Sequence, residues 1–274
     1  TGLVVVGDLT SGSVSEQQAM VGDTPNLAAR LQALAEPGAV VVADSTRRLL
    51  GDLFTFQDLG HREVKGISES IALWAVEGGA ASESRFEAVR TVRSIGFVGR
   101  KAEIELVRAR EQLAYQGEGQ VVLISGEAGI GKSRLVATLS ETPAFGAPRR
   151  LRYQCSPYHS NTALHPFIAQ LERAAGIGLQ DSPEQKLNKL EVMLALGTQQ
   201  VARAVPLIAA LLSIPTGERY PPLGLSPVQQ RRQTFAVLLD QFEGLARQQP
   251  LLIVCEDMHW ADATTLELFD LAVD

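Results

Sequence analysis

The chain contains 274 residues, of which 45% are hydrophobic and 20% are charged, and its formal net charge is -6. Those proportions are ordinary for a globular protein, while the acidic balance argues against a broad nucleic-acid-binding surface. No stretch approaches the roughly 20 consecutive apolar residues of a membrane-spanning helix. We therefore expect no membrane as a partner and, because of the acidic charge, no nucleic acid. Cys155 and Cys255 are the only cysteines and lack metal-ligand spacing, which indicates a reducing, cytoplasmic compartment.

The length allows two domains, each with a core of its own. The sequence starts without Met inside an apolar run, Gly2 to Gly7, and stops inside an apolar helical pattern, Leu266 to Val273. Domains rarely begin and end within core elements. We therefore interpret the chain as a fragment truncated at both ends.

The first predicted domain, residues 1–78, has the pattern of an α/β unit. Residues 23–34 predict a helix that Asp23 or Thr24 caps, with an apolar face formed by Leu27, Leu31 and Leu34. The other predicted elements are strands at residues 3–6, 18–21, 40–42, 54–59 and 71–76 and a short helix at residues 45–50. The first two strands are expected to pair as a hairpin.

Asn26 and Arg30 lie four residues apart on the predicted helix and share a side away from its leucines. A carboxamide and a guanidinium on one face could bind a ribose and a phosphate together. A solvated polar face would give the same spacing, so the pattern alone leaves both interpretations open.

The run from Gly22 to Ala43, with Val64–Ile67 and Ile71–Val76 after it, resembles the second half of a class III adenylate/guanylate cyclase domain. The resemblance implies a partial ferredoxin-like fold. It also implies that Asn26 orients the ribose of ATP and that Arg30 stabilises charge on the α-phosphate as cyclic AMP and pyrophosphate form. Sites of this family lie between two such domains, so a second cyclase-type domain, in a homodimer or pseudo-dimer, is an expected partner.

Two departures from this family affect the expected activity. Ala19 stands seven residues before Asn26, where the family usually carries Asp or Thr to read the base, which leaves adenine or guanine selectivity open. The family's metal-binding aspartates lie in the upstream half, and we interpret Asp8 and Asp23 as turn or cap residues. We therefore expect no cyclic nucleotide from this fragment alone.

Residues 79–95 are rich in small residues and predict a linker to a second domain, residues 96–274. A helix is expected at Lys101–Tyr115. Val121–Ser125 then predicts a strand, and the pattern G-x-x-x-x-G-K-S follows before a helix that begins near Arg134. Glycines at these spacings let successive N–H groups point at a phosphate, and the helix adds its positive dipole end.

This loop predicts a site for ATP and Mg²⁺, the two expected cofactors. The predicted nucleotide-binding residues of the loop are Gly126, Glu127, Ala128, Gly129, Ile130, Gly131, Lys132, Ser133 and Arg134. Lys132 would reach the β- and γ-phosphates, and the Ser133 hydroxyl would ligate Mg²⁺. The alternative is a glycine-rich turn with a solvated lysine.

Beyond the loop, residues 151–155 predict a strand, and residues 167–246 predict an all-helical insertion. His159 and His165 lie in the loop between them without acidic or cysteine partners at ligand spacing, so no metal site is expected there. Leu251–Val254 predicts a strand buried on both faces of a parallel sheet. It leads into Glu256, which we assign to Mg²⁺, and Asp257, which we assign to the attacking water, although the two roles could be exchanged.

Cys255–Asp262, with its E-D-x-H-W-A-D form, resembles the corresponding strand of AAA/STAND-type signal-transduction ATPases, as does the earlier run Phe97–Arg100. The resemblance implies that His259, Trp260 and Asp262 lie near the γ-phosphate. It also implies that Arg100 approaches the adenine end of the nucleotide, although Arg100 could equally be a surface cation.

The leading functional prediction is a signalling protein in which a Mg·ATP-hydrolysing switch regulates a nucleotidyl cyclase module. The alternative is a non-catalytic regulator. Its degenerate cyclase-like domain would serve dimerisation or nucleotide sensing, and its P-loop domain would be a ligand-gated scaffold or transcriptional regulator. Ala19 favours this alternative. A small-molecule kinase shares the phosphate-binding loop, but the strand that leads into Glu256 and Asp257 and the helical insertion argue against it.

Overall fold

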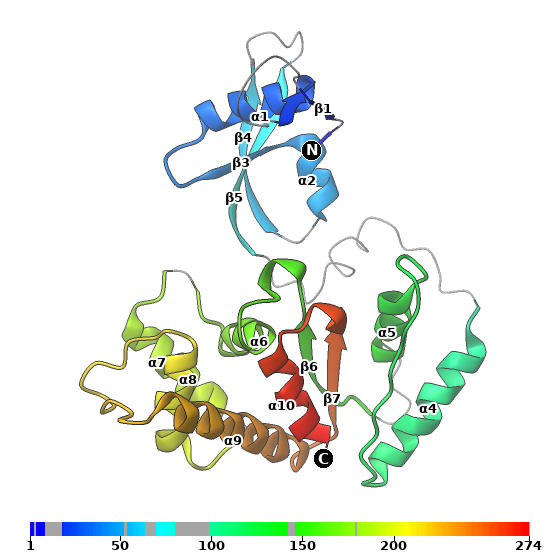
Figure 1. Ribbon diagram of the computed structural model, residues 1–274, viewed down its shortest axis with the longest axis vertical. Helices are drawn as coiled ribbons and strands as arrows, with labels where there is room; N and C mark the ends of the chain where they lie inside the picture. Colours follow the sequence, from blue (N-terminus) through cyan, green and yellow to red (C-terminus); the bar gives the residue numbers. More distant parts are fainter. Residues whose placement is uncertain are drawn as a thin grey trace. The chain divides into compact units, whose positions relative to one another are not determined.

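The structure, a computed structural model, describes residues 1–2, 4–8, 18–51, 54–63, 70–79, 99–141, 146–178 and 180–273. The chain divides into two compact units, Thr1–Gly96 and Phe97–Asp274 (Figure 1). Of the expected linker, residues 80–95 lie outside the described ranges, as do Val64–Ile67 and the pair Phe97–Val98. None of the helices in these ranges has the length and apolar character to cross a membrane.

The first unit combines a hairpin with a three-stranded antiparallel sheet. Its elements are β1 (Val5–Asp8), β2 (Gln18–Val21), α1 (Asp23–Leu34), β3 (Val40–Ala43), α2 (Asp44–Leu50), β4 (Phe54–Arg62) and β5 (Ile71–Gly79). β1 pairs antiparallel with β2, as predicted, and the sheet has the order β3-β5-β4. The other predicted elements agree closely, with β4 and β5 longer than the sequence indicated, but the first strand is Val5–Asp8 instead of residues 3–6. Asp8, which we interpreted as a turn or cap residue, is therefore the last residue of β1, because its backbone pairs with Gln18.

The core of the first unit is small. Leu31 of α1 packs with Ala43 and Leu73, and Leu27 lies against them. Leu34 was predicted to belong to the same face but is 50% exposed, because it is the final residue of α1, beyond the turn that packs on the sheet. The predicted side-chain cap is also wrong: Gly22 occupies the N-cap position, and no side chain accepts a hydrogen bond there.

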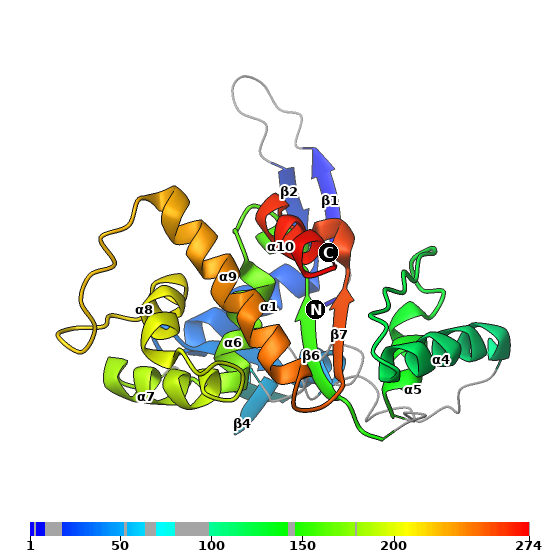
Figure 2. The same cartoon turned by 90° about the horizontal axis from the view of Figure 1, so that it is seen from below.

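The second unit contains a parallel strand pair and a mainly helical remainder. Its elements are α4 (Lys101–Tyr115), α5 (Lys132–Glu141), β6 (Arg149–Gln154), η2 (Pro157–His159), α6 (His165–Ala175), α7 (Pro183–Leu194), α8 (Val201–Leu211), α9 (Pro227–Ala246), β7 (Leu251–Glu256), η3 (Met258–Trp260) and α10 (Ala263–Val273). β6 and β7 run parallel, with Arg149 opposite Leu251 and Gln154 opposite Glu256. The four helices between them in sequence form the predicted insertion (Figure 2).

The core of the second unit joins the strand pair to this insertion. Tyr153 of β6 and Phe167 of α6 are each 1% exposed, and their ring centroids are 4.6 Å apart. Phe242 of α9 and Phe269 of α10 complete an aromatic group around them. The insertion therefore packs directly on the strand that precedes it. By contrast, Leu252 of β7 is 36% exposed, so the expected burial of both faces of this strand is wrong.

The predicted strand Val121–Ser125 is absent, although these residues lie within the described part of the chain. Val121 is 69% and Leu123 is 86% exposed. A strand needs a neighbour with which its backbone groups pair. In the described residues of this unit the only sheet is the β6–β7 pair, and its ladder does not include residues 121–125. The apolar composition predicted a strand that has no partner here.

Candidate functional site

The loop before α5 adopts a backbone that requires its glycines. Gly126, Gly129 and Gly131 have φ values of 156°, 79° and 98°. L-residues rarely adopt these values, because a Cβ atom would clash with the backbone. At Gly126 an added Cβ would also lie 3.2 Å from the Cγ2 atom of Ile130. The three glycines of the sequence pattern thus each occupy a backbone conformation that favours glycine.

Lys132 is the first residue of α5, and its side chain folds back over the loop. Its Nζ atom donates hydrogen bonds to the carbonyl oxygens of Gly126, at 2.9 Å, and Glu127, at 3.0 Å. Ser133 follows in the first turn and is half-buried, as is Arg134, whereas Glu127, Ala128 and Ile130 are exposed. The ammonium group, the helix start and the hydroxyl are therefore gathered at one end of α5.

Arg100 extends this group from a second helix. It lies at the N-cap of α4 with φ 53°, and its Nη2 atom donates a hydrogen bond to the carbonyl oxygen of Ile130 at 2.9 Å. Its guanidinium lies 3.8 Å from the Glu103 carboxylate. Arg100 therefore contacts the loop before α5, while its side chain remains 36% exposed, and its expected approach to the adenine end of a nucleotide stays a prediction.

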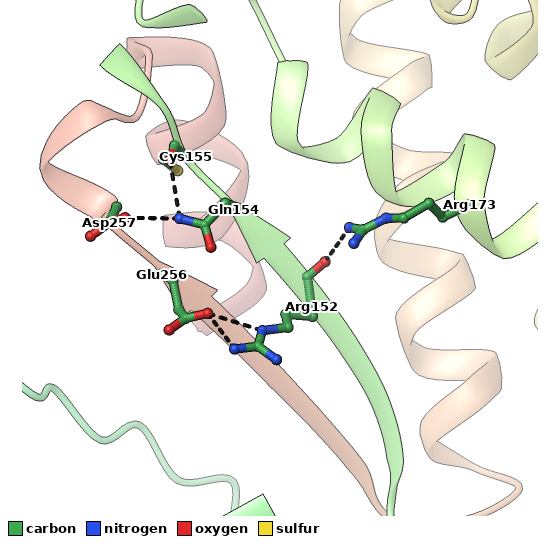
Figure 3. Close-up of polar contacts among 6 residues, drawn as sticks. All are labelled: Arg152, Gln154, Cys155, Arg173, Glu256 and Asp257. Carbon is green, nitrogen blue, oxygen red and sulfur yellow. Dashed lines mark hydrogen bonds and ion pairs between the residues drawn. The ribbon is translucent and has the colours of Figure 1, made fainter. Parts of the chain in front are cut away.

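The two acids at the end of β7 are held by two residues of β6 (Figure 3). Arg152 donates to the Oε2 atom of Glu256 through Nε, at 3.0 Å, and Nη2, at 2.5 Å. Gln154 donates through Nε2 to the Oδ2 atom of Asp257 at 2.9 Å. Glu256 is 9% exposed, whereas Asp257 is exposed and has φ 56°. The acids therefore differ in burial and in the charge of their partners.

Sequence reasoning missed Arg152 and Gln154. They lie two residues apart on β6 and so share a face of the strand. The alternation of Arg152, Tyr153 and Gln154 could have indicated a polar and an apolar face. It could not have identified the partner strand, because the parallel register with β7 depends on the insertion that separates them.

The segment after β7 carries the remaining residues singled out in the sequence. His259 and Trp260 lie in η3, with ring centroids 4.9 Å apart. The amides of Thr264 and Thr265 donate to the Oδ1 atom of Asp262, which therefore caps α10. The structure thus gives Asp262 a capping function at the start of a helix.

The two histidines between β6 and α6 stack on each other. The rings of His159 and His165 are 3.6 Å apart at an interplanar angle of 7°. Burial, and secondly the neighbouring His159, lower the pKa of His165, while the Asp262 carboxylate opposes the shift. In the ranges that the structure describes, no three His, Cys, Asp or Glu side chains gather as a metal-binding group.

The residues of the second unit fit Mg·ATP in their chemistry. The loop has the glycine conformations that a phosphate cradle needs, and Lys132 and Arg100 contribute cationic groups beside it. Ser133, Glu256 and Asp257 offer oxygen donors, the type that Mg²⁺ prefers. Figures 1 and 2 both draw α5 on the β7 side of the strand pair.

In the first unit, Asn26 is exposed and Arg30 is half-buried on α1. Leu27 and Leu31 of the same helix pack on the sheet. Asn26 is therefore open to solvent and Arg30 partly so, and their joint role in binding stays a prediction. Ala19 lies within β2, but its side chain is outside the described part of the structure.

Comparison with known families identifies both units. The sequence model of the AAA ATPase domain matches residues 96–274. The chain belongs to this AAA ATPase domain family. A second model, that of the adenylate and guanylate cyclase catalytic domain, matches residues 1–78. The chain therefore joins a cyclase-type domain to an AAA ATPase domain, and the resemblances inferred from the sequence are confirmed.

Two curated proteins are similar to parts or most of this AAA ATPase chain. An uncharacterised protein of Rhizobium meliloti, R02095, is 29% identical over 92% of the chain and 24% of its own length. The pH-sensitive adenylate cyclase MT1302 of Mycobacterium tuberculosis is 38% identical over 25% of the chain and 18% of its own length. The chain thus spans a quarter or less of the length of these relatives. No solved structure matches it.

Proposed function

We propose that this chain is the junction of a signalling protein in which a Mg·ATP-hydrolysing AAA module regulates a class III nucleotidyl cyclase module. The observation that carries the proposal is the loop at residues 126–131, where three glycines adopt positive φ and Lys132 folds over the loop carbonyls. The matches of both halves to ATP-using families support it. Membership of a family does not by itself assign an activity, so each residue role is argued from its position in the structure.

In the AAA module, loop amides and the α5 N-terminus would bind the phosphates of ATP, and Lys132 would exchange its carbonyl partners for phosphate oxygens. Ser133 and Glu256 would hold Mg²⁺, and Asp257 would orient the attacking water. A bound Mg²⁺ would neutralise the negative charge that develops on the phosphates. Arg100, already on the Ile130 carbonyl, would connect the bound nucleotide to α4. Hydrolysis would then reset a conformational state.

In the cyclase module, Asn26 would orient the ribose and Arg30 would stabilise charge on the α-phosphate while ATP is converted to cyclic AMP and pyrophosphate. The exposure of Asn26 and the partial exposure of Arg30, one turn apart on α1, support these roles. A second cyclase-type domain would complete the site.

One sequence feature favours a second candidate function. Ala19 occupies the position at which a base-reading Asp or Thr is expected, and alanine offers no hydrogen-bonding group. With this residue the first domain could serve dimerisation or nucleotide sensing without turnover. Cyclic nucleotide formation by a chain that includes the whole cyclase domain distinguishes the two functions.

The experiment that tests nucleotide binding is a titration of the 274-residue chain with a fluorescent ATP analogue. Lys132→Ala should weaken binding by about 100-fold, because it removes a charge-assisted contact to phosphate worth roughly 3 kcal/mol. Lys101→Ala, at an exposed lysine that likewise begins a helix, is the matched control and should bind as the wild type does. Unchanged affinity in Lys132→Ala would overturn the assignment of the loop.

A further inference from the structure

The ion pair between Arg152 and Glu256 is unusual in its geometry. Two nitrogen atoms of the guanidinium, Nε and Nη2, both donate to the same carboxylate oxygen, Oε2. The other oxygen, Oε1, accepts no hydrogen bond from the part of the chain that the structure describes, and Figure 3 shows it directed away from Arg152. Arg152 therefore occupies one half of the carboxylate and leaves the other half available.

Both partners are largely removed from solvent, with side-chain exposures of 11% for Arg152 and 9% for Glu256. A buried ion pair is a poor source of net stability, because the loss of hydration offsets most of the attraction. The pair does fix geometry, since neither side chain can move away without leaving the charge of the other buried and unpaired. The pair is thus better suited to hold the carboxylate in one orientation than to stabilise the fold.

The Arg152 side of the pair is itself anchored. Arg173 of α6 donates through Nη2 to the backbone carbonyl of Arg152 at 3.1 Å and through Nε to the carbonyl of Ala169 at 3.2 Å. Figure 3 shows this contact reaching β6 from the helix that packs against it. The strand position from which Arg152 extends is therefore fixed by the helical insertion.

We propose that Arg152 is a positioning residue for the magnesium site: it holds Oε2 of Glu256 and thereby presents Oε1 to the hydration shell of Mg²⁺. The inference rests on the proposed Mg·ATP function. In this proposal Arg152 acts through Glu256 and is assigned no direct contact with nucleotide or metal. Asp257 pairs with the neutral amide of Gln154 and lies outside this arrangement.

The test compares ATP affinity with Mg²⁺ and with EDTA in the 274-residue chain, using a fluorescent ATP analogue. Mutation of a residue that hydrogen-bonds to a metal ligand typically lowers metal affinity by about 10–100-fold. Arg152→Gln should therefore leave affinity in EDTA within about twofold of wild type and reduce the Mg²⁺-dependent gain by about tenfold. Arg152→Lys retains one donor for Oε2 and should restore part of that gain. Arg150→Gln, at an exposed arginine of the same strand, is the control.

A double-mutant cycle separates positioning from a merely structural effect. In the Glu256→Gln background, Arg152→Gln should produce no further loss of the Mg²⁺-dependent gain, because its effect passes through Glu256. This comparison also remains valid if Arg152→Gln alone fails to fold, since the double variant replaces both buried charges by neutral amides.

The outcomes distinguish the inference from the proposed function. A wild-type chain that binds no ATP in either condition overturns both. If wild type binds and gains affinity from Mg²⁺ while Arg152→Gln retains the whole gain, the positioning role alone is wrong. A further loss of about tenfold in the Glu256→Gln background would also overturn it, because Arg152 would then act by another route.

Discussion

The Oδ2 atom of Asp262 accepts a hydrogen bond from the buried hydroxyl of Thr265 at 2.5 Å, while Oδ1 accepts the Thr264 and Thr265 amides. Asp262 is 8% exposed and Thr265 is fully buried. The carboxylate satisfies donors that the first turn of α10 would otherwise leave unpaired. An acid that the family resemblance associates with the γ-phosphate is therefore committed to the start of a helix.

Asp262→Ala should lower the free energy of unfolding by about 2–3 kcal/mol, from the lost cap and the unpaired Thr265 hydroxyl. Urea unfolding followed by circular dichroism measures the change. Thr264→Ala removes a side chain and keeps the amide that bonds Asp262, so it serves as the control and should shift the midpoint little. An Asp262→Ala chain with wild-type stability and no ATP binding would show that the carboxylate serves the nucleotide instead.

Asp257→Asn should retain ATP binding and lose hydrolysis by about 100-fold or more, because an amide cannot orient or accept a proton from water as a carboxylate does. Asn tolerates the left-handed backbone at φ 56° better than most residues, so the fold should be preserved. Phosphate release measures the rate. Asp270→Asn on the exposed side of α10 is the matched control.

Glu256→Gln should also lose hydrolysis, together with part of the Mg²⁺-dependent gain in ATP affinity, because the proposed Ser133 ligand remains. Unlike Asp257→Asn, it leaves Arg152 buried without a carboxylate, so a lower free energy of unfolding is expected as well. Measuring phosphate release and urea unfolding on the same preparation separates the two effects. Wild-type hydrolysis in both acid variants would refute the assignment of this strand end.

Arg30→Ala should reduce cyclic AMP formation by about 100-fold in a chain that includes the whole cyclase domain, since a guanidinium that stabilises developing phosphate charge is removed. Asn26→Ala should also be impaired. Neither should change thermal stability much, because Asn26 is exposed and Arg30 is only partly buried. Gln32→Ala, at an exposed position on the same helix, is the control. Cyclic AMP formation at the rate of the control in both Arg30→Ala and Asn26→Ala would refute these two roles, whereas its absence from the unsubstituted chain favours the non-catalytic regulator.

Cys155 and Cys255 should resist thiol reagents at pH 8 until the chain unfolds. Burial raises the pKa of the Cys155 thiol to about 11, with the Asp262 and Asp257 carboxylates adding to the effect. Burial, and then Cys155, raise the pKa of Cys255 to about 12. The reactive thiolate is therefore scarce in the folded chain. Fast, stoichiometric reaction without denaturant would contradict the burial of both thiols.

The raised pKa values of the two thiols also predict how the free energy of unfolding depends on pH. Unfolded thiols ionise near pH 8.5, whereas the folded ones hold their protons to about pH 11 and 12. The folded chain then binds more protons than the unfolded chain, so this contribution is complete below about pH 8.5 and is lost as pH rises toward those values. Cys255→Ala should flatten the alkaline decline in a pH series of urea unfolding.

The helices were the most predictable part of the fold. The sequence predicts the helix Lys101–Tyr115 with the bounds that the structure has, and the predicted helical insertion contains α6, α7, α8 and α9 joined by loops. Local signals explain this success: Ser182 and Ser226 each form a capping box before a proline-initiated helix. A helix satisfies its backbone within itself, so local sequence is sufficient information.

The strands and the acid pair were less predictable for the opposite reason. Val121–Ser125 has the composition of a strand, but a ladder needs a second segment, and no local pattern identifies it. Likewise Glu256 and Asp257 were found as a pair, while their partners on β6 lie about a hundred positions earlier in the sequence. The phosphate-binding loop was predictable because its geometry depends on glycines within a few residues of each other.

The exposed run Val121–Ser125 has a consequence for handling the protein. Leu123 is 86% exposed. Among the described strands, β7 pairs with β6 alone. Extended apolar segments and open strand edges are templates on which another copy can add a strand. Preparations of this chain should therefore self-associate as their concentration rises, and a lysine at Leu123 is the simplest change to keep them monodisperse.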